Sequence, residues 1–238
     1  MRSAIAYLIA SALMVSCALG DPAQYRNRGP GWYTVKPGDT LYSIAWRYGL
    51  DSQQLAGWNS IDLEAPIHPG QRLLLIKPSG QASTANSIRA SGEREPKPDQ
   101  VKPSSGSSAQ PMSSPDPRNW IWPTAGKPMN TFLATRLDRR GIDIAGKLGQ
   151  SVVAAADGKV VYSGNGLAGY GNLIIIKHSE TFLSAYAYCQ QRLVEEGMSV
   201  KAGKQVATMG ERDNTAQLHF EIRRNGKPVD PLKYLPRQ

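Results

Sequence analysis

The sequence predicts a multidomain chain in which a small α+β module of βααβ order, residues 31–77, precedes a mainly antiparallel all-β domain, residues 119–238. Three observations predict this fold class. Residues 78–118 are rich in Ser, Pro and Gly and nearly lack large apolar side chains. Before this segment, apolar residues recur at helical spacing, and after it, short β-patterned runs alternate with turns. The 238-residue chain therefore divides at a linker.

The segment between the two predicted domains, residues 78–118, has the composition of an unfolded chain. It cannot bury enough apolar surface to offset the conformational entropy that ordering would cost. We therefore expect a disordered linker that tethers two domains working at a distance from each other.

The first residues, 1–17, have the features of an export signal peptide. Arg2 precedes an uncharged run of apolar and small residues that ends at Cys17, and this run is too short for a membrane-spanning helix. Residues 14–17, MVSC, resemble a bacterial lipobox, in which the cysteine is lipidated and becomes the mature N-terminus. With Ala18 next, the resemblance implies an outer-membrane lipoprotein that faces the periplasm of a Gram-negative cell. The alternative is that Cys17 is an incidental thiol in a signal cut elsewhere.

Cysteine content and charge limit the other classes of protein. If Cys17 carries lipid, Cys189 has no partner, and no intramolecular disulfide is expected in the mature chain. The net charge of +9 suits an anionic partner such as a nucleic acid, a membrane surface or an acidic polymer. The chain has no Lys/Arg run typical of a nucleic-acid-binding arm, so we expect no nucleic-acid partner.

The predicted βααβ module begins with a short strand at residues 32–35, which a turn at residues 36–39 follows. Thr40 can cap a first helix and Asp51 a second, and residues 71–76 close the module with another strand. The apolar positions at helical spacing are Leu41, Ile44, Ala45, Tyr48, Leu55 and Trp58.

This module resembles the LysM family over its full length, through "YTVKPGDTLYSIA" and "N…I…PGQRLLL". The resemblance implies binding to glycan that contains N-acetylglucosamine, chiefly peptidoglycan, in a groove beside the first strand–helix loop. The residues expected at this groove are Gly38, Asp39, Thr40, Asn59 and Ile61. Gly38 also suits the turn, and Asp39 and Thr40 suit the helix cap, so local roles compete with sugar contact. His68 lies in an expected exposed turn and is assigned no role.

The predicted all-β domain contains the runs "KVVYSG", "NLIIIKH", "TFLSAYAY" and "QLHFEIR". Asn225-Gly226 is a strong hairpin signal between two strands. Residues 164–169 match G-x-G-x-x-G, but they lead into a strand, so they predict a hairpin loop and no dinucleotide site. His178 lies at a strand–turn junction and is expected to be structural.

Polar side chains alternate with apolar ones in "QLHFEI", so Gln217, His219 and Glu221 are expected to face a cleft while the alternate residues fill the core. By the same alternation, Tyr186 and Tyr188 in "AYAYC" are predicted to share one strand face.

These runs, with "RRGIDIA", resemble the LytM (lysostaphin-type) zinc metallopeptidases that cut peptidoglycan cross-bridges, a fold of duplicated hybrid motif type. That family uses H-x-G-x-D, Y-x-H and H-x-H, and its zinc is held by the first His, the Asp and the last His. Here Arg139 takes the first ligand position, Tyr188 and Gln217 replace two further histidines, and only Asp143 and His219 remain. Because catalytic zinc needs three protein ligands, we expect no metal, no cofactor and no catalysis. Arg139 either pairs with Asp143 or faces solvent.

Lipobox, LysM module, linker and altered LytM domain together resemble the NlpD-like murein hydrolase activator lipoproteins. The resemblance implies a non-enzymatic activator of periplasmic N-acetylmuramoyl-L-alanine amidases. Such an activator is anchored to the membrane by lipid, bound to peptidoglycan glycan strands, and acts in septal peptidoglycan splitting and daughter-cell separation. The partner-binding cleft is predicted at Arg139, Asp143, Tyr186, Tyr188, Gln217 and His219. The alternatives are a passive tether between outer membrane and peptidoglycan and, against the lost histidines, an active zinc endopeptidase.

Overall fold

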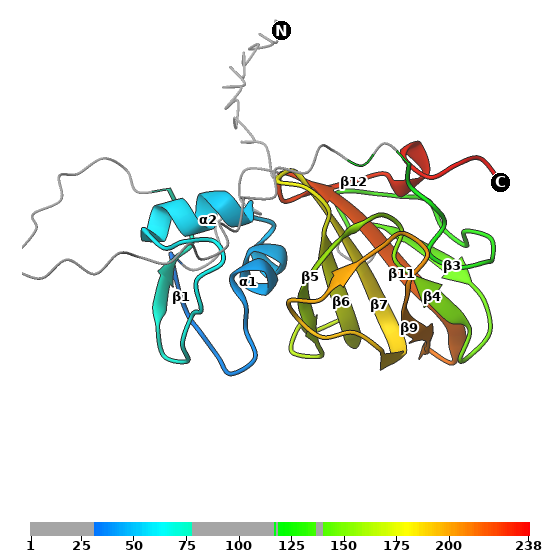
Figure 1. Cartoon of the computed structure of the whole chain (residues 1–238), viewed down its shortest axis with the longest axis horizontal. Coiled ribbons are helices and arrows are strands. Elements are labelled where there is room, and N and C mark those ends of the chain that lie inside the picture. Colours follow the sequence, from blue (N-terminus) through cyan, green and yellow to red (C-terminus); the bar gives the residue numbers. More distant parts are fainter. Residues whose placement is uncertain (1–30, 78–116, 118, 137–139) are drawn as a thin grey trace, which may run out of the picture.

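The computed structural model describes residues 31–77, 117, 119–136 and 140–238 (Figure 1). It contains a small N-terminal module, residues 31–77, and a sheet domain, residues 119–238. The expected signal peptide and, apart from residue 117, the expected linker lie outside the described residues. Among the described helices, none combines the length and the apolar character that a membrane span requires.

The N-terminal module has the predicted βααβ order. Its elements are β1 (Trp32–Thr34), α1 (Leu41–Tyr48), α2 (Ser52–Asn59) and β2 (Arg72–Leu74). β1 and β2 pair antiparallel. Thr40 caps α1 by accepting a hydrogen bond from the Ser43 amide at 3.1 Å, and Asp51 caps α2 by accepting one from the Gln54 amide at 3.0 Å. Both predicted caps are therefore confirmed.

The sheet domain is all-β, as predicted, with a short 3₁₀ turn near its end. Its strands are β3 (Ile142–Ala145), β4 (Ser151–Val153), β5 (Gly158–Gly164), β6 (Asn172–Lys177), β7 (Phe182–Arg192), β8 (Ser199–Val200), β9 (Gln205–Met209), β10 (Glu211–Arg212), β11 (Thr215–Arg224) and β12 (Lys227–Val229), before the turn η2 (Pro231–Lys233). The strand order is β10-β11-β7-β6-β5-β8, all pairs are antiparallel, and β3 and β12 both pair with β11.

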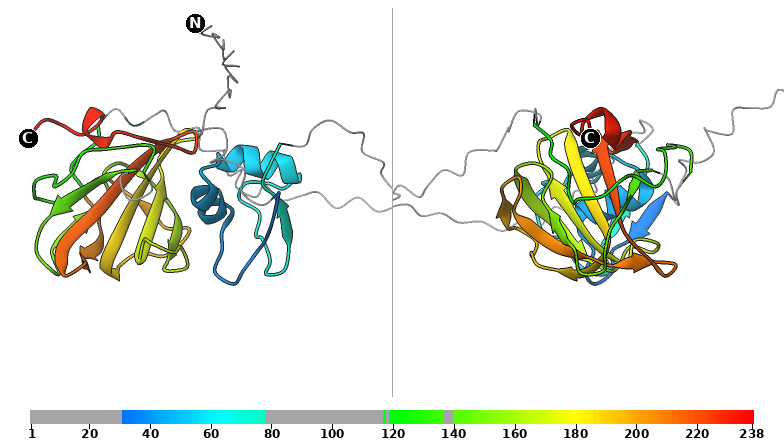
Figure 2. Two further views of the ribbon diagram at one scale, coloured as in Figure 1. Left: turned by 180° about the vertical axis from the view of Figure 1, so that it is seen from behind. Right: turned by 90° about the vertical axis from the view of Figure 1, so that its right-hand side faces the viewer.

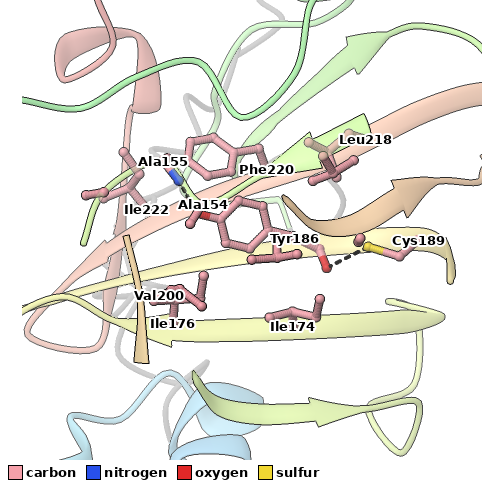
Figure 3. Close-up of a cluster of buried hydrophobic side chains, with 14 of the residues drawn as sticks. Ala154, Ala155, Ile174, Ile176, Tyr186, Cys189, Val200, Leu218, Phe220 and Ile222 are labelled. Atoms are coloured by element: carbon pink, nitrogen blue, oxygen red, sulfur yellow. Dashed lines mark hydrogen bonds between the residues drawn. The ribbon is translucent and has the colours of Figure 1, made fainter. Parts of the chain in front are cut away.

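One face of this sheet carries the core of the domain (Figure 3). Leu218, Phe220 and Ile222 of β11 point into it and are fully buried, as their alternation predicted. Ile174 and Ile176 of β6 add to the same cluster. The intervening residues of these strands therefore lie on the opposite face, which carries the site described below.

The predicted turns are confirmed. Asn225 and Gly226 have φ values of 49° and 73° and connect β11 to its antiparallel partner β12, the geometry of a two-residue hairpin turn. Residues 164–171 connect β5 to β6 as a hairpin loop, in which Gly169 and Gly171 have positive φ. No helix follows this loop, so it offers no helix N-terminus to a phosphate.

The expectation that the two domains work at a distance is wrong for this structure, because α1 packs against the sheet domain (Figures 1 and 2). α1 uses Ile44 for the core of its own module, whereas Tyr42 and Trp46 form a second apolar stripe at i, i+4 spacing. That stripe is buried in a cluster shared by both domains. This interface cluster consists of Tyr42, Trp46, Val161, Tyr162, Leu167, Leu173, Ile175, Ala185 and Ala187.

Candidate functional site

The predicted remnant metal site lies where β3 and β7 flank β11. In the register of the sheet, His219 lies opposite Asp143 on one side and opposite Ala187 on the other. Residues directly opposite each other in antiparallel strands share a face, so Asp143 and His219 meet on the face that does not hold the core. Both predicted remnant residues are therefore brought together, and both are buried.

Asp143 is held from two sides. Its Oδ1 lies 2.6 Å from Nδ1 of His219, and its Oδ2 accepts a hydrogen bond from the Asn130 side-chain amide. Asn130 returns the contact, because its Oδ1 accepts from the Asp143 backbone N–H at 3.0 Å. The sequence analysis missed Asn130, because it stands alone in a stretch without a motif or a regular period.

The second ring nitrogen of His219 faces another carboxylate. Nε2 lies 3.3 Å from Oε1 of Glu221, which also accepts a hydrogen bond from the Tyr170 hydroxyl at 2.7 Å. Oε2 of Glu221 accepts from Nε of Arg223 at 3.0 Å. Asp143, His219, Glu221 and Arg223 thus form a continuous buried series of charges, which we name the ion chain.

Electrostatics favour the charged form of each inner member of the ion chain. Burial alone would lower the pKa of His219, but hydrogen bonds to Asp143 and Glu221 outweigh it and raise that pKa to about 9. Burial alone would raise the pKa of Glu221, but the charges of Arg223 and His219 lower it to about 2. At neutral pH the site therefore holds an imidazolium between two carboxylates.

This donor set does not fit a zinc ion. A histidine ligand must offer a free nitrogen, whereas both ring nitrogens of His219 lie at hydrogen-bond distance from carboxylates. Asp143 and Glu221 also approach opposite ring nitrogens, so the three groups do not converge on one point. In the described part of the chain, no three His, Cys, Asp or Glu side chains are placed to hold a metal. Arg139 lies outside the described residues, so its pairing with Asp143 stays a prediction.

The two predicted cleft tyrosines point in different directions. Tyr188 has a φ of 59°, and the pairing of β7 shifts register beside it, which interrupts the alternation of the strand. Its ring centroid lies 5.9 Å from that of His219, on the cleft face. Tyr186, by contrast, is fully buried in the core, where its hydroxyl accepts a hydrogen bond from the Ala155 amide at 2.8 Å (Figure 3). The prediction that Tyr186 faces the cleft is therefore wrong.

An open cleft of about 590 Å³ lies beside Asp143, at one end of the ion chain. It is lined by Met129, Asn130, Thr131, Asp143, Arg212, Asp213 and Gln217. Gln217 lies where the sequence predicts it, and its side-chain amide donates to the Arg212 carbonyl oxygen at 3.4 Å. The Arg212 guanidinium carbon lies 5.3 Å from the centroid of the Tyr188 ring, a cation–π contact at the edge of the cleft. Sequence reasoning did not select Arg212.

The predicted glycan-site residues of the N-terminal module all have local partners. Asp39 accepts hydrogen bonds from the Tyr33 hydroxyl at 2.6 Å and the Lys36 amide at 2.8 Å. Gly38 has a φ of 79°, which the turn requires. Asn59 binds the backbone N–H of residue 74 at 2.6 Å and its carbonyl oxygen at 3.0 Å.

Ile61 is partly buried against the module's own core. The competing local roles considered for Gly38, Asp39 and Thr40 are thus present in the structure. Sugar contact by any of the five residues stays a prediction.

Comparison with known proteins identifies both domains. The LysM domain model matches residues 33–75, and the model of peptidase family M23 matches residues 138–231. The lipoprotein NlpD/LppB homolog of Pseudomonas aeruginosa is 42% identical over 234 residues, which cover 87% of this chain and 78% of that protein. The murein hydrolase activator NlpD of Escherichia coli K12 is 38% identical over 257 residues, covering 87% and 68%. A zinc-containing peptidase from Vibrio cholerae matches with a TM-score of 0.46 and 28% identity over 50% of this chain and 41% of its own.

Proposed function

Because the chain belongs to the NlpD/LppB family of lipoproteins, we propose that it activates murein hydrolases and is not itself a hydrolase. The relative from Escherichia coli carries the name murein hydrolase activator, and the LysM domain of this chain supplies the means of reaching peptidoglycan. The hydrolases that we propose as partners are periplasmic N-acetylmuramoyl-L-alanine amidases, acting when septal peptidoglycan is split.

The observation that carries this proposal is the ion chain. By the resemblance to lysostaphin-type peptidases, Asp143 and His219 match two zinc-ligand positions, and here they bind each other while the second ring nitrogen of His219 faces Glu221. With both ring nitrogens engaged by carboxylates, His219 offers no free nitrogen to a metal or to a water molecule. Beside Asp143 lies an open cleft, which suits the binding of a protein segment.

Lipid anchoring is part of the same proposal. The relatives are named lipoproteins, and one from Haemophilus influenzae is named outer membrane antigenic lipoprotein B. With Cys17 lipidated, the chain would hold its sheet domain in the periplasm, where the amidases act on the peptidoglycan that the N-terminal module binds.

One experiment separates activator, enzyme and tether. Purified protein is incubated with dye-labelled sacculi, alone and with an amidase, and released dye is measured. We expect no dye release by this protein alone and faster release by the two proteins together than by the amidase alone. Treating this protein with a zinc chelator before it is mixed with the amidase should leave the stimulated rate unchanged. Release by the protein alone that a chelator abolishes would identify an endopeptidase.

A passive tether is the second candidate, favoured by the combination of LysM domain and lipobox. It predicts binding to sacculi without any increase in amidase activity. Failure to stimulate any periplasmic amidase of the same organism, by protein that still binds sacculi, would replace the activator proposal with this one.

A further inference from the structure

The face of the sheet domain that carries the ion chain is also the face on which α1 packs. In the sheet register, His219 lies opposite Ala187 and Glu221 lies opposite Ala185, so these side chains occupy one continuous surface. Ala185 and Ala187 belong to the interface cluster, which Trp46 of α1 enters from the other domain. The N-terminal module therefore covers the sheet directly beside the remnant metal site.

The ion chain ends on the N-terminal module. The Arg223 guanidinium carbon lies 3.5 Å from the centroid of the Trp46 ring, and its Nη1 donates to the Trp46 carbonyl oxygen at 2.7 Å. Exposure is 1% for Arg223 and 2% for Trp46, and a desolvated guanidinium over an indole is a strong form of cation–π contact. Because Arg223 also binds Glu221, it couples the remnant site to the position of the module.

The loop predicted to bind glycan takes part in the same interface. The Thr40 hydroxyl donates to the Val161 carbonyl oxygen at 3.2 Å. Arg47 donates to the Gly166 carbonyl oxygen at 3.2 Å and pairs with Asp39 at 3.3 Å. Thr40 therefore touches the sheet domain directly, and Asp39 touches it through Arg47.

We propose that this docked arrangement is a closed state, in which the sheet domain and glycan containing N-acetylglucosamine compete for the first loop of the N-terminal module. Glycan binding releases the module and exposes the sheet face beside the remnant site. Use of that exposed face by a hydrolase rests on the proposed function, whereas the competition itself does not.

Two physical arguments favour the closed state in the absence of glycan. The sheet half of the interface cluster is apolar, and soluble proteins rarely leave such a surface in water. Both domains belong to one chain, so even a weak interface forms at the high effective concentration that a tether provides. The apparent affinity for glycan then equals the affinity of the open form multiplied by the fraction of molecules that are open. By linkage, glycan shifts the equilibrium between closed and open forms by the same free energy.

The first test places a charge in the interface from the sheet side, on a residue that is not part of the glycan loop. Ile175→Lys buries an ammonium group in the closed state but leaves it in water in the open state. We expect the full chain carrying this change to bind an N-acetylglucosamine oligomer about tenfold more tightly, if the closed form makes up about nine-tenths of the wild type. Leu193→Lys, the same charge gain at an exposed apolar residue outside the cluster, should leave this affinity unchanged.

Circular dichroism and thermal unfolding establish that both variants are folded. Unchanged oligomer affinity in folded Ile175→Lys protein would overturn the competition, and so would an equal gain in Leu193→Lys protein. This test contains no hydrolase, so its failure leaves the proposed function standing.

The second test follows opening directly through the ion pair at the rim of the interface. Nζ of Lys159 lies 2.7 Å from Oε2 of Glu64 on the other domain, and both side chains are partly exposed. Cysteines at these two positions, in a Cys17→Ala chain, are joined with a short bis-maleimide. Burial raises the pKa of Cys189 to about 12, so that thiol stays inert.

We expect the cross-linking yield to fall as an N-acetylglucosamine oligomer is added, and to stay constant with a glucose oligomer of equal length. A yield that saturating N-acetylglucosamine oligomer does not change would overturn the competition. The cross-linked protein should also bind the oligomer more weakly and stimulate the amidase less. Full stimulation by cross-linked protein with weakened oligomer binding would overturn only the use of this face by the hydrolase.

Discussion

His219 holds its ring between two carboxylates, and this placement decides the chemistry of the site. Asp143 and Glu221 each engage one ring nitrogen, at 2.6 Å and 3.3 Å. Arg223 balances the second carboxylate, so the buried charges alternate in sign along the ion chain. A buried series of this kind is stable only while every member keeps its partner.

The stability of the sheet domain should fall as the pH rises from about 6.5 to about 9. The pKa of His219 is raised from 6.5 to about 9 on folding. Its contribution to the free energy of unfolding is therefore complete below pH 6.5 and is lost as the pH passes 9. The full loss is on the order of 3 kcal/mol. Glu221 has its effect in acid, because its pKa is lowered to about 2 on folding. Its contribution to the free energy of unfolding is lost as the pH falls from about 4.5 to 2.

Urea unfolding midpoints across this alkaline range measure the effect. His219→Gln removes the titrating group, so this variant should be less stable than the wild type at neutral pH. Its unfolding midpoint should also no longer fall as the pH rises from 6.5 to 9. A wild-type midpoint that is constant between pH 6.5 and 9 would contradict the protonation assigned to His219.

At the scale of elements, the site depends on how closely β3 approaches β11. A Cβ placed on Gly141, just before β3, would lie 2.2 Å from the Phe220 carbonyl oxygen. Glycine is therefore required there, and the close approach sets Asp143 opposite His219. Gly141 is the residue that the resemblance matches to the glycine of H-x-G-x-D, and this packing role does not require a metal.

Gly141→Ala should destabilise the sheet domain by about 1–3 kcal/mol, because the added methyl group collides with backbone that cannot move aside. The matched control is Gly57→Ala in α2, where an added Cβ meets nothing within 4 Å. That change should stabilise its helix by up to about 1 kcal/mol. Thermal unfolding of each variant supplies the measurement, and equal effects of the two substitutions would refute the packing argument.

β10 places Arg212 at the cleft, over the ring of Tyr188. If the cleft binds an amidase, Arg212→Glu should reduce stimulation roughly tenfold or more, since arginines at the centre of an interface often dominate its binding energy. Arg224→Glu makes the same charge change at the far end of β11, where the guanidinium lies over Phe182. This second variant should keep wild-type stimulation in the dye-release assay, and equal losses in both would place the partner surface elsewhere.

At the scale of the whole molecule, the N-terminal module and the sheet domain pack against each other. The module packs on the face that holds the remnant site, and it also carries the predicted glycan loop. The closed state proposed above would make glycan binding and the proposed partner binding depend on each other.

Cys17→Ala should produce an unprocessed or soluble periplasmic protein, because the thiol that would accept the lipid is gone. Fractionation of cells into soluble, inner-membrane and outer-membrane material, followed by immunoblotting, measures this directly. Ser16→Ala, which retains the cysteine and a small residue before it, should stay with the outer membrane. An unchanged distribution of the Cys17→Ala protein would reject the lipobox.

The sequence by itself determined the elements, because their signals are local. Thr40 and Asp51 cap helices a few residues away, Asn225-Gly226 sets its own turn, and the alternation around His219 separates core from cleft. Motif spacing also indicates that zinc-site histidines are replaced, which stays a prediction.

Only the tertiary structure decided which distant groups meet. Asn130 and Tyr170 join the site from loops whose sequence carries no such signal. The left-handed backbone of Tyr188 turns this side chain to the cleft face, whereas Tyr186 stays on the core face with Phe182. Trp46 and Arg223 are 177 residues apart in sequence, so their contact depends on which faces of two separately folded domains bury each other. The pairing of these faces depends on the apolar area and charge that each domain leaves exposed once it has folded. The spacing of neighbouring residues in the sequence contains no information about that pairing.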